Sequence, residues 1–222
     1  MRRYQPYPAY KDSGVEWLGE VPEQWAPKRL KYVANIVMGQ SPPSDECNLD
    51  GEGQPFLQGC AEFTDYSPLA RQYCKIAAKH AETGDILFSV RAPVGAMNVA
   101  DHEYGIGRGL CAIKATSVDD RFLWWSLSWH KDQLSPLATG STYEAVTVNQ
   151  VGNLYISLPD SEQTAIATFL DRETAKLDTL IAKQEMLIEL LQEKRQALIS
   201  HAVTKGLNLR ETLIYSNLMD CM

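Results

Sequence analysis

The longest regular pattern of hydrophobic and polar positions begins near Asp160 and continues to Val203 without a glycine or proline. Leucines recur in it every seven residues, with Gln184 in one position of the row, and a second row lies three residues ahead. These rows are the a and d positions of a coiled-coil heptad, so they predict one long helix with an apolar edge. A polar residue in such a row either fixes the register of paired helices or marks a poorly packed position. The residues expected along the edge are Leu170, Leu177, Ile181, Gln184, Ile188, Leu191 and Leu198.

The predicted helix has recognisable ends. Ser161 with Thr164, or Asp160 with Gln163, provides an N-terminal cap, and Gly206 stands where the helix is expected to stop. At ~1.5 Å per residue the helix spans roughly 63 Å. Because a helix of this length cannot fold back into a small domain, its apolar edge needs a partner. The simpler alternative is a long surface helix of one globular domain.

The residues before this helix change pattern every few positions and predict short strands joined by turns. The clearest strand is GDILFSV at 84–90, where Ile86, Phe88 and Val90 share one side. Shorter strands are expected in PFLQG, MNVA, GLCAIKA and NLYISLP. The segment KRLKYVANIVMG is expected to form a short helix or a strand that ends at Gly39.

One segment switches to helical spacing. Phe122, Trp125 and Trp129 lie on one face of DDRFLWWSLSWHKDQL, which is expected to begin at Asp119 or Asp120. We expect these aromatic rings to pack into the core rather than to stack on nucleic-acid bases.

The basic residues Arg71, Lys75 and Lys79 are spaced by four, which is compatible with a shared helix face. The expected fold class is α+β. Its expected parts are an irregular β-rich domain with short helices at 1–158, the long coiled-coil helix at 159–206 and a tail at 207–222.

The chain has 222 residues and a formal net charge of −7, which is not concentrated in one region. Residues 1–155 hold 14 basic and 18 acidic side chains. Because nucleic-acid binding depends largely on neutralising phosphates, this charge argues against a non-specific DNA-binding protein that acts alone. It remains compatible with a chain that reads bases through a few residues while a basic partner contacts the phosphates.

The five cysteines are odd in number and form no CxxC pair, and the four histidines lie far apart. This spacing argues against a zinc site, and free thiols in a cytoplasmic protein are the expectation. No run of eighteen apolar residues and no signal-peptide pattern occurs. We therefore expect a soluble protein that is neither exported nor embedded in a membrane.

No motif in the chain predicts catalysis. GxSxG, GxxxxGK, GxGxxG and HExxH are absent, and no helix pattern follows GIGRGL to cradle a phosphate. Polar residues gather instead in the expected loops, where arginine can pair with guanine and glutamine with adenine. For each arginine taken alone, a surface salt bridge is the simpler interpretation. The residues expected to contact nucleic acid as a set are Gln40, Ser41, Gln58, Ser89, Arg91, Arg108, Ser141, Thr142, Tyr143 and Gln150.

Three stretches resemble one known family. They are GVEWLGEVPEQW at 14–25, GDILFSVRAPVGAMNV at 84–99 with GRGLCAI at 107–113, and the block LPDSEQTA…VTKGLN at 158–208. Together they resemble the specificity subunit of type I restriction–modification enzymes. The C-terminal block is the most specific part, and its matching residues are Pro159, Glu162, Gln163, Ile166, Phe169, Leu170, Asp171, Thr174, Lys194, Arg195, Leu198 and Ile199.

The resemblance implies a target recognition domain that binds double-stranded DNA, followed by a long spacer helix, and no catalytic role. A usual member has two of each, the helices packing antiparallel, and each domain reads half of a bipartite site. It docks modification (methyltransferase) subunits, which use S-adenosylmethionine, and restriction subunits join them, so the specificity subunit needs no cofactor. This chain holds one domain and one helix, because no second GVEWLGE-like segment follows GLN at 206–208. We therefore expect a half-length form, either natural or truncated.

An unpaired amphipathic helix leaves its apolar edge in water, whereas each buried leucine or isoleucine contributes ~1.5–3 kcal/mol. We therefore expect an antiparallel homodimer with the recognition domains at opposite ends, which predicts a palindromic bipartite DNA site. The alternative is a truncated coiled-coil protein that docks a partner without reading DNA.

Overall fold

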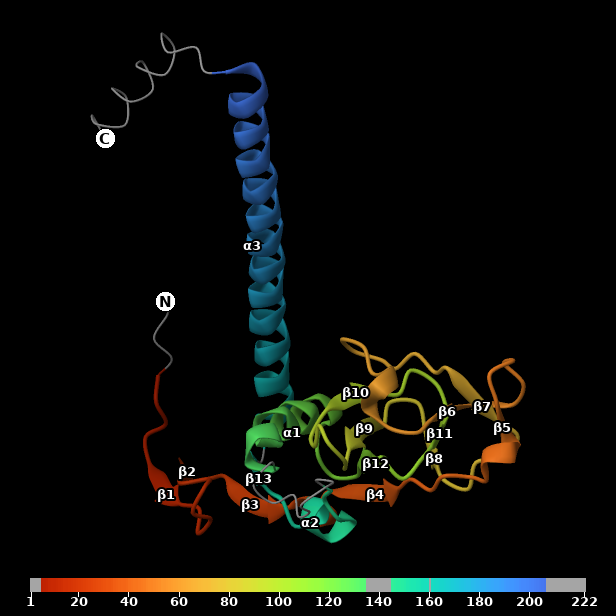
Figure 1. Cartoon of the computed structure of the whole chain (residues 1–222). Helices are drawn as coiled ribbons and strands as arrows, with labels where there is room; N and C mark the ends of the chain where they lie inside the picture. Colours follow the sequence, from red (N-terminus) through yellow and green to blue (C-terminus); the bar gives the residue numbers. More distant parts are fainter. Residues whose placement is uncertain (1–4, 135–144, 160, 207–222) are drawn as a thin grey trace. The chain divides into compact units, whose positions relative to one another are not determined.

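The computed structural model describes residues 5–134, 145–159 and 161–206 (Figure 1). The chain divides into two compact units, Met1–Thr168 and Phe169–Met222. The sequence pattern places a domain boundary after residue 158, whereas the first compact unit continues to Thr168. The difference arises because Ile166 and Ala167, on the first turns of the long helix, pack into the core of the first unit.

Short strands build the first unit (Figure 1). Within the described ranges, one pair joins β1 (Tyr10–Asp12) to β2 (Glu20–Pro22), and another joins β3 (Ala26–Arg29) to β13 (Tyr155–Leu158). A four-stranded antiparallel sheet has the order β10-β9-β12-β4, formed by Met97–Val99, Ile86–Ser89, Leu110–Ala115 and Ala34–Met38. A five-stranded sheet has the order β5-β7-β6-β11-β8, formed by Cys47–Asn48, Gln72–Cys74, Gln54–Leu57, Tyr104–Ile106 and His80–Ala81. Short 3-10 turns occur at Leu30–Tyr32, Ser44–Glu46 and Cys60–Glu62.

The central strands β9 and β12 divide the core because successive side chains of a strand point to opposite faces. Ile86, Phe88 and Val90 belong to one buried cluster, whereas Leu87 belongs to a second cluster together with Ile106. The predicted strand is confirmed over Ile86–Ser89, and its three apolar residues share one buried cluster as expected. The β-rich α+β fold as a whole is confirmed.

Helix α1 (Asp120–Leu134) begins after Asp119, whose carboxylate accepts the backbone N–H groups of Arg121 and Phe122 at 3.0 Å. The predicted helix and one of its two predicted starts are confirmed. The aromatic face is only partly buried: Phe122 is buried, Trp125 is half-buried and Trp129 is 52% exposed. The expected packing into the core is confirmed for Phe122 and Trp125, whereas Trp129 stays largely exposed. The buried edge of the helix continues through Leu123, Leu127 and His130.

His130 joins α1 to the last strand of this unit. Its side chain is buried, and its ring nitrogens lie at hydrogen-bond distance from the carbonyl oxygens of Ser126 and Tyr155. Burial lowers the pKa of His130 below its ordinary value, and the two carbonyl oxygens oppose this shift. The imidazole therefore stays neutral in the folded protein at pH values where it is charged in the unfolded chain.

This shift predicts that the protein loses stability as it is acidified. Because the folded pKa of His130 lies below the unfolded value of about 6.5, the unfolded chain binds more protons as the pH falls. The contribution of His130 to the free energy of unfolding is therefore complete above that pH and is lost below it. We expect the melting temperature to fall between pH 7.5 and 5.5, and to fall less in His130→Asn. Equal pH dependence of the melting temperature in the two proteins would contradict this prediction.

The region around Arg71, Lys75 and Lys79 forms no helix, so the shared helix face expected there is wrong. Gln72–Cys74 is strand β7 and His80–Ala81 is strand β8, both in the five-stranded sheet. A spacing of four among three basic residues is a weak signal when no apolar row accompanies it.

Cys47 and Cys74 form a disulfide, which corrects the expectation of free thiols for this pair. They are register partners on β5 and β7, with Cα atoms 4.2 Å apart. Neighbouring strands bring together cysteines that are 27 residues apart in the sequence, which cysteine spacing alone does not reveal. Cys60 and Cys111 are free.

A short helix, α2 (Val148–Gly152), contains Gln150, which was expected to lie in a loop. Thr147 and Gln150 form a capping box: the Thr147 hydroxyl accepts the backbone N–H of Gln150 at 3.3 Å, and Gln150 Oε1 accepts the backbone N–H of Thr147 at 2.8 Å. A helix of one turn is too short to produce a helical period in the hydrophobic pattern.

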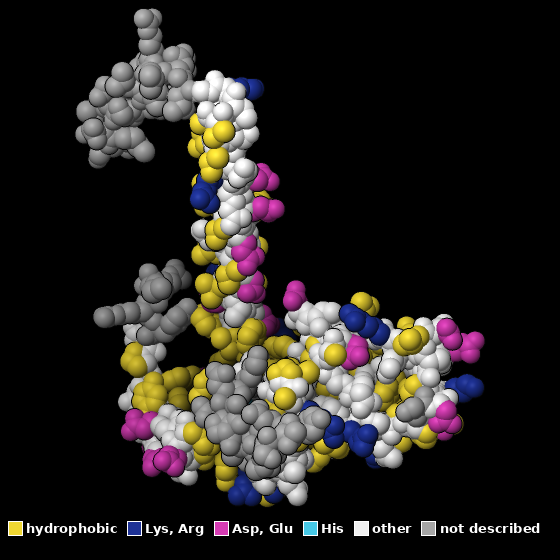
Figure 2. Space-filling view, viewed as in Figure 1, with side chains coloured by type: hydrophobic (Ala, Val, Ile, Leu, Met, Phe, Trp, Pro, Cys, Tyr) yellow, Lys and Arg dark blue, Asp and Glu magenta, His cyan; other side chains and the backbone are white. Residues whose placement is uncertain are grey.

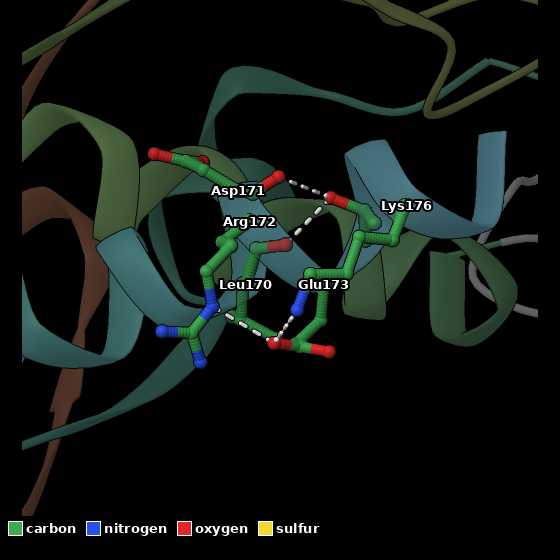
Figure 3. Close-up of polar contacts among 6 residues, drawn as sticks. Leu170, Asp171, Arg172, Glu173 and Lys176 are labelled. Carbon is green, nitrogen blue, oxygen red and sulfur yellow. Dashed lines mark hydrogen bonds and ion pairs between the residues drawn. The ribbon is translucent and has the colours of Figure 1, made fainter. Parts of the chain in front are cut away.

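Helix α3 (Gln163–Lys205) confirms the long helix predicted from the heptads. It ends at Gly206, which adopts a φ of 74° and donates its N–H to the Ala202 carbonyl at 3.2 Å. Near residue 173 the helix surface carries a local ion-pair cluster, in which Glu173 Oε1 accepts Arg172 Nε and Lys176 Nζ, each at 2.8 Å (Figure 3).

The predicted apolar edge of α3 is exposed. Leu177, Ile181, Ile188, Leu191 and Leu198 retain between 55% and 62% of their accessible surface, whereas Leu170 is half-buried and Gln184 is exposed. Figure 2 shows hydrophobic side chains following one edge of this helix, with acidic side chains along another. The helix thus presents an apolar strip to solvent.

Candidate nucleic-acid interface

One end of the four-stranded sheet gathers three segments that are far apart in the sequence. β12 pairs with β4 through Cys111 and Met38, and with β9 through Leu110 and Ser89. The ladders extend beyond the strands, because Gly39 donates to the Leu110 carbonyl at 2.9 Å and Val90 donates to the Gly109 carbonyl at 3.0 Å. Following both registers places Arg108 level with Ser41 on one side and with Arg91 on the other.

The end of β6 from the second sheet joins the same place. The backbone N–H of Gly107 donates to the Leu57 carbonyl at 2.8 Å, and that of Gly109 donates to the Gln58 carbonyl at 3.2 Å. The 106–109 turn therefore bridges the two sheets and holds Gln58 beside Arg108.

Glycine is required where these segments cross. A Cβ atom on Gly39 would lie 2.1 Å from the Gly107 carbonyl oxygen, and one on Gly109 would lie 2.6 Å from the Gln58 carbonyl oxygen. Both obstructing atoms are backbone, so a side chain at either position forces the segments apart.

We expect Gly39→Ala to destabilise the first compact unit by about 1–3 kcal/mol, the usual cost of overpacking. The matched control is Gly59→Ala, because no atom lies within 4 Å of a Cβ at Gly59 and its φ of −165° is extended. Urea unfolding of both variants measures the difference. Equal unfolding midpoints for the two variants would count against the close crossing.

Ser41 lies at the centre of a polar cluster with Gln58 and Arg108 at this end of the sheet. Its hydroxyl donates to Gln58 Oε1 at 3.0 Å and accepts the backbone N–H of Arg108 at 3.2 Å and Arg108 Nε at 3.3 Å, and Gln58 Nε2 also lies 2.8 Å from it. Holding Nε fixes the plane of the guanidinium. The two terminal nitrogens, the pair that arginine uses to bind a base bidentately, have no hydrogen bond or ion pair to the described residues.

The cluster lies at the side of a hollow of about 350 Å³. Arg108 is the one charged residue among those that line it, and no lining residue is acidic. The lining residues are Ser41, Pro42, Cys47, Asn48, Leu49, Phe56, Gln58, Gln72 and Arg108. A hollow with a braced arginine, amide groups and no carboxylate suits a ligand that offers hydrogen-bond acceptors and negative charge.

The structure brings together half of the residues expected to contact nucleic acid. Ser41, Gln58 and Arg108 form the cluster, Gln40 is the exposed neighbour whose backbone N–H donates to the Ile106 carbonyl at 2.8 Å, and Arg91 is exposed at the same sheet end. Arg91 also forms an isolated bridge with Ala145.

Two expected residues have structural roles instead. Ser89 is 1% exposed and donates its hydroxyl to the Arg91 carbonyl at 2.7 Å, so it shapes the turn after β9 and offers DNA no surface. Gln150 uses its side-chain oxygen in the capping box of α2. Ser141, Thr142 and Tyr143 lie outside the described residues.

Sequence reasoning missed Leu49 and Gln72, which both line the hollow. Gln72 lies on β7 opposite Phe56 of β6, and Leu49 follows β5 directly. Their place depends on the pairing of β5, β6 and β7, which no local pattern in the sequence indicates.

Comparison with known protein families identifies the family of this chain. The family model described as the type I restriction modification DNA specificity domain matches residues 22–190. The chain belongs to this family. The MjaX type I restriction enzyme specificity subunit of Methanocaldococcus jannaschii is 38% identical over 193 residues, which is 84% of this chain and 44% of that protein.

Solved structures support the same family assignment. The HsdS subunit from Thermoanaerobacter tengcongensis matches with a TM-score of 0.71 and 36% identity, covering 89% of this chain and 48% of that one. A chain from a structure of the type I R-M system, on complex assembly and conformational transition, matches with a TM-score of 0.79, 36% identity and coverage of 89% and 49%. This chain thus spans about half the length of the specificity subunits that it matches.

The recognised resemblance is therefore confirmed at the level of the family and the fold. Among the described residues, no helix combines the length and the hydropathy needed to cross a membrane, and no group of three or more metal-ligating side chains occurs.

Proposed function

We propose that this specificity-family chain is the DNA-reading component of a type I restriction–modification complex and that it performs no catalytic step itself. The observation that carries the proposal is the convergence of Ser41, Gln58, Arg91 and Arg108 at one sheet end, beside a hollow without carboxylates. Arginine and amide side chains held in a fixed pose are the groups that distinguish bases in the major groove.

The exposed edge of α3 supports pairing with a second copy. The leucine row is symmetric about Gln184, with Leu170 and Leu177 before it and Leu191 and Leu198 after it. An antiparallel pair related by a two-fold axis places equivalent residues on opposite sides of its centre, so such a row meets a matching row. Each of these residues gains ~1.5–3 kcal/mol on complete burial.

Charge also favours the antiparallel arrangement over a parallel one. Glu173 stands eleven positions before Gln184, and Arg195 stands eleven after it. An antiparallel pair centred on Gln184 brings acid and base together at each end, whereas a parallel pair in register sets Glu173 against Glu173. We propose a homodimer of this form, with one recognition unit at each end and a palindromic bipartite DNA site.

The remaining partners follow from the same proposal. The modification subunit holds S-adenosylmethionine and supplies phosphate contacts that this acidic chain lacks, and a restriction subunit joins the assembly. The alternative of a docking protein that reads no DNA is less favoured, because it gives no reason for the braced Arg108 beside an open hollow.

Selection of bound duplexes from a random DNA library tests the proposal. The complex with the modification subunit should enrich one bipartite sequence, and the isolated chain should bind DNA weakly and with strong salt dependence. Failure to enrich any sequence, or tight binding by the isolated chain that salt does not weaken, would overturn it.

A further inference from the structure

Two kinds of side chain line the hollow beside Arg108. Ser41, Gln58 and Arg108 are polar, and their side chains are joined by hydrogen bonds. Phe56 and Leu49 are apolar, and Leu49 is 75% exposed although it is a large hydrophobic residue. An exposed leucine beside an arginine indicates a ligand that has both polar and apolar groups on one edge.

The loop that carries Leu49 is held in place by hydrogen bonds and a neighbouring disulfide. Asn48 closes this loop: its Oδ1 accepts the N–H of Asp50 at 3.0 Å and that of Glu52 at 3.2 Å, and its Nδ2 donates to the Glu52 carbonyl at 2.7 Å. The adjacent Cys47–Cys74 disulfide ties the strand before this loop to β7. Because the loop backbone is already ordered, a ligand that contacts Leu49 has little loop ordering to impose.

Gln72 supplies the amide that Gln58 cannot. The Gln58 side chain is engaged with the Ser41 hydroxyl, so Gln58 positions Arg108 through Ser41. Gln72 is exposed on β7, lines the hollow, and has no side-chain hydrogen bond to the described residues. It therefore presents both a donor and an acceptor.

These three groups match the chemistry of base edges in the major groove. Arginine binds guanine O6 and N7, glutamine binds adenine N6 and N7, and an apolar side chain contacts the C5-methyl group of thymine. The minor groove displays no thymine methyl group, so an exposed leucine would have no partner there.

We propose that this hollow reads a guanine and a neighbouring A·T base pair from the major groove. Arg108 binds the guanine, Gln72 binds the adenine, and Leu49 contacts the thymine methyl group. Gln58 and Ser41 are positioning residues that orient the guanidinium. This assignment rests on the proposed DNA-reading function and adds which residues read which bases.

Base analogues test the assignment once the selected sequence is known. Replacing the thymine with uracil removes one methyl group and should weaken binding by the complex about four-fold, the value of one buried methyl group. The Leu49→Ala complex should bind the thymine and uracil duplexes equally, and the Gln72→Ala complex should accept other base pairs at the A·T position. Leu69→Ala and Gln24→Ala, which change exposed residues outside the hollow, should behave as the wild type.

The outcomes separate the assignment from the function. If the complex enriches no sequence, both the proposed function and this assignment fail. If it enriches a sequence but Leu49→Ala keeps the full uracil penalty, or Gln72→Ala keeps a strict A·T preference, the assignment fails while the function stands. Uracil tolerated at every thymine position by the wild type also overturns the thymine contact.

Discussion

Leu191→Glu is expected to dissociate the proposed homodimer into monomers. Leu191 lies on the apolar edge of α3, where it remains exposed in the single chain. In a symmetric pair the substitution occurs twice, and each copy replaces a buried leucine by a carboxylate. Losing two leucines of ~2 kcal/mol each weakens association roughly a thousand-fold before any charge penalty is counted. Sedimentation equilibrium at micromolar concentration measures the change in Kd.

Ala182→Glu is the matched control for this experiment. Ala182 lies on the same helix, about 160° around from Gln184 at the ordinary 100° per residue, and so points away from the leucine row. The Ala182→Glu substitution adds the same charge as Leu191→Glu and should leave the proposed dimer intact. A dimer that survives Leu191→Glu, or one that Ala182→Glu dissociates equally well, would show that another surface joins the copies.

Arg108→Ala should strongly weaken the sequence preference of the complex. A bidentate arginine–guanine pair provides about 1–3 kcal/mol of discrimination, and the proposed dimer uses it twice, so we expect a loss of about 30-fold or more in preference for the selected site. The measurement is competition between the selected duplex and one with the guanine pairs exchanged. The Nε and the backbone N–H of Arg108 both donate to the Ser41 hydroxyl. The substitution therefore removes a guanidinium group that is held in one orientation.

Arg108→Lys separates charge from geometry. Lysine retains the positive charge but lacks the planar fork, so the variant should still bind DNA while losing most of its preference for guanine. Arg71→Ala removes an exposed arginine that does not line the hollow, and should change affinity for all sequences together or not at all. Unchanged preference in both Arg108 variants would contradict the assignment of this arginine to base reading.

The elements that sequence alone predicted are those with a long or strongly alternating pattern. The heptads of α3, the alternation of Ile86, Phe88 and Val90, and the Asp119 cap of α1 all depend on neighbouring residues in the chain. Local spacing was therefore sufficient for each of them. Arg108 and Ser41 were found for a related reason, because both stand in glycine- or proline-rich turns directly beside a strand.

The missed features depend on contacts between distant segments. The Cys47–Cys74 disulfide and the position of Gln72 follow from strand pairing across the five-stranded sheet. Ser89 was misplaced because it ends a strand whose side chains are buried on both faces, so alternation did not give it a solvent side. Strand pairing, rather than composition or spacing, determines which polar residues face the hollow.

The most direct test of the central claim is the position of methyl groups left on DNA by this chain with its modification subunit. The account predicts methylation within two copies of one short sequence, inverted relative to each other and separated by a constant spacer. Methylation at a single half-site without an inverted copy, or at two different half-sequences, would contradict the paired reader proposed for this chain.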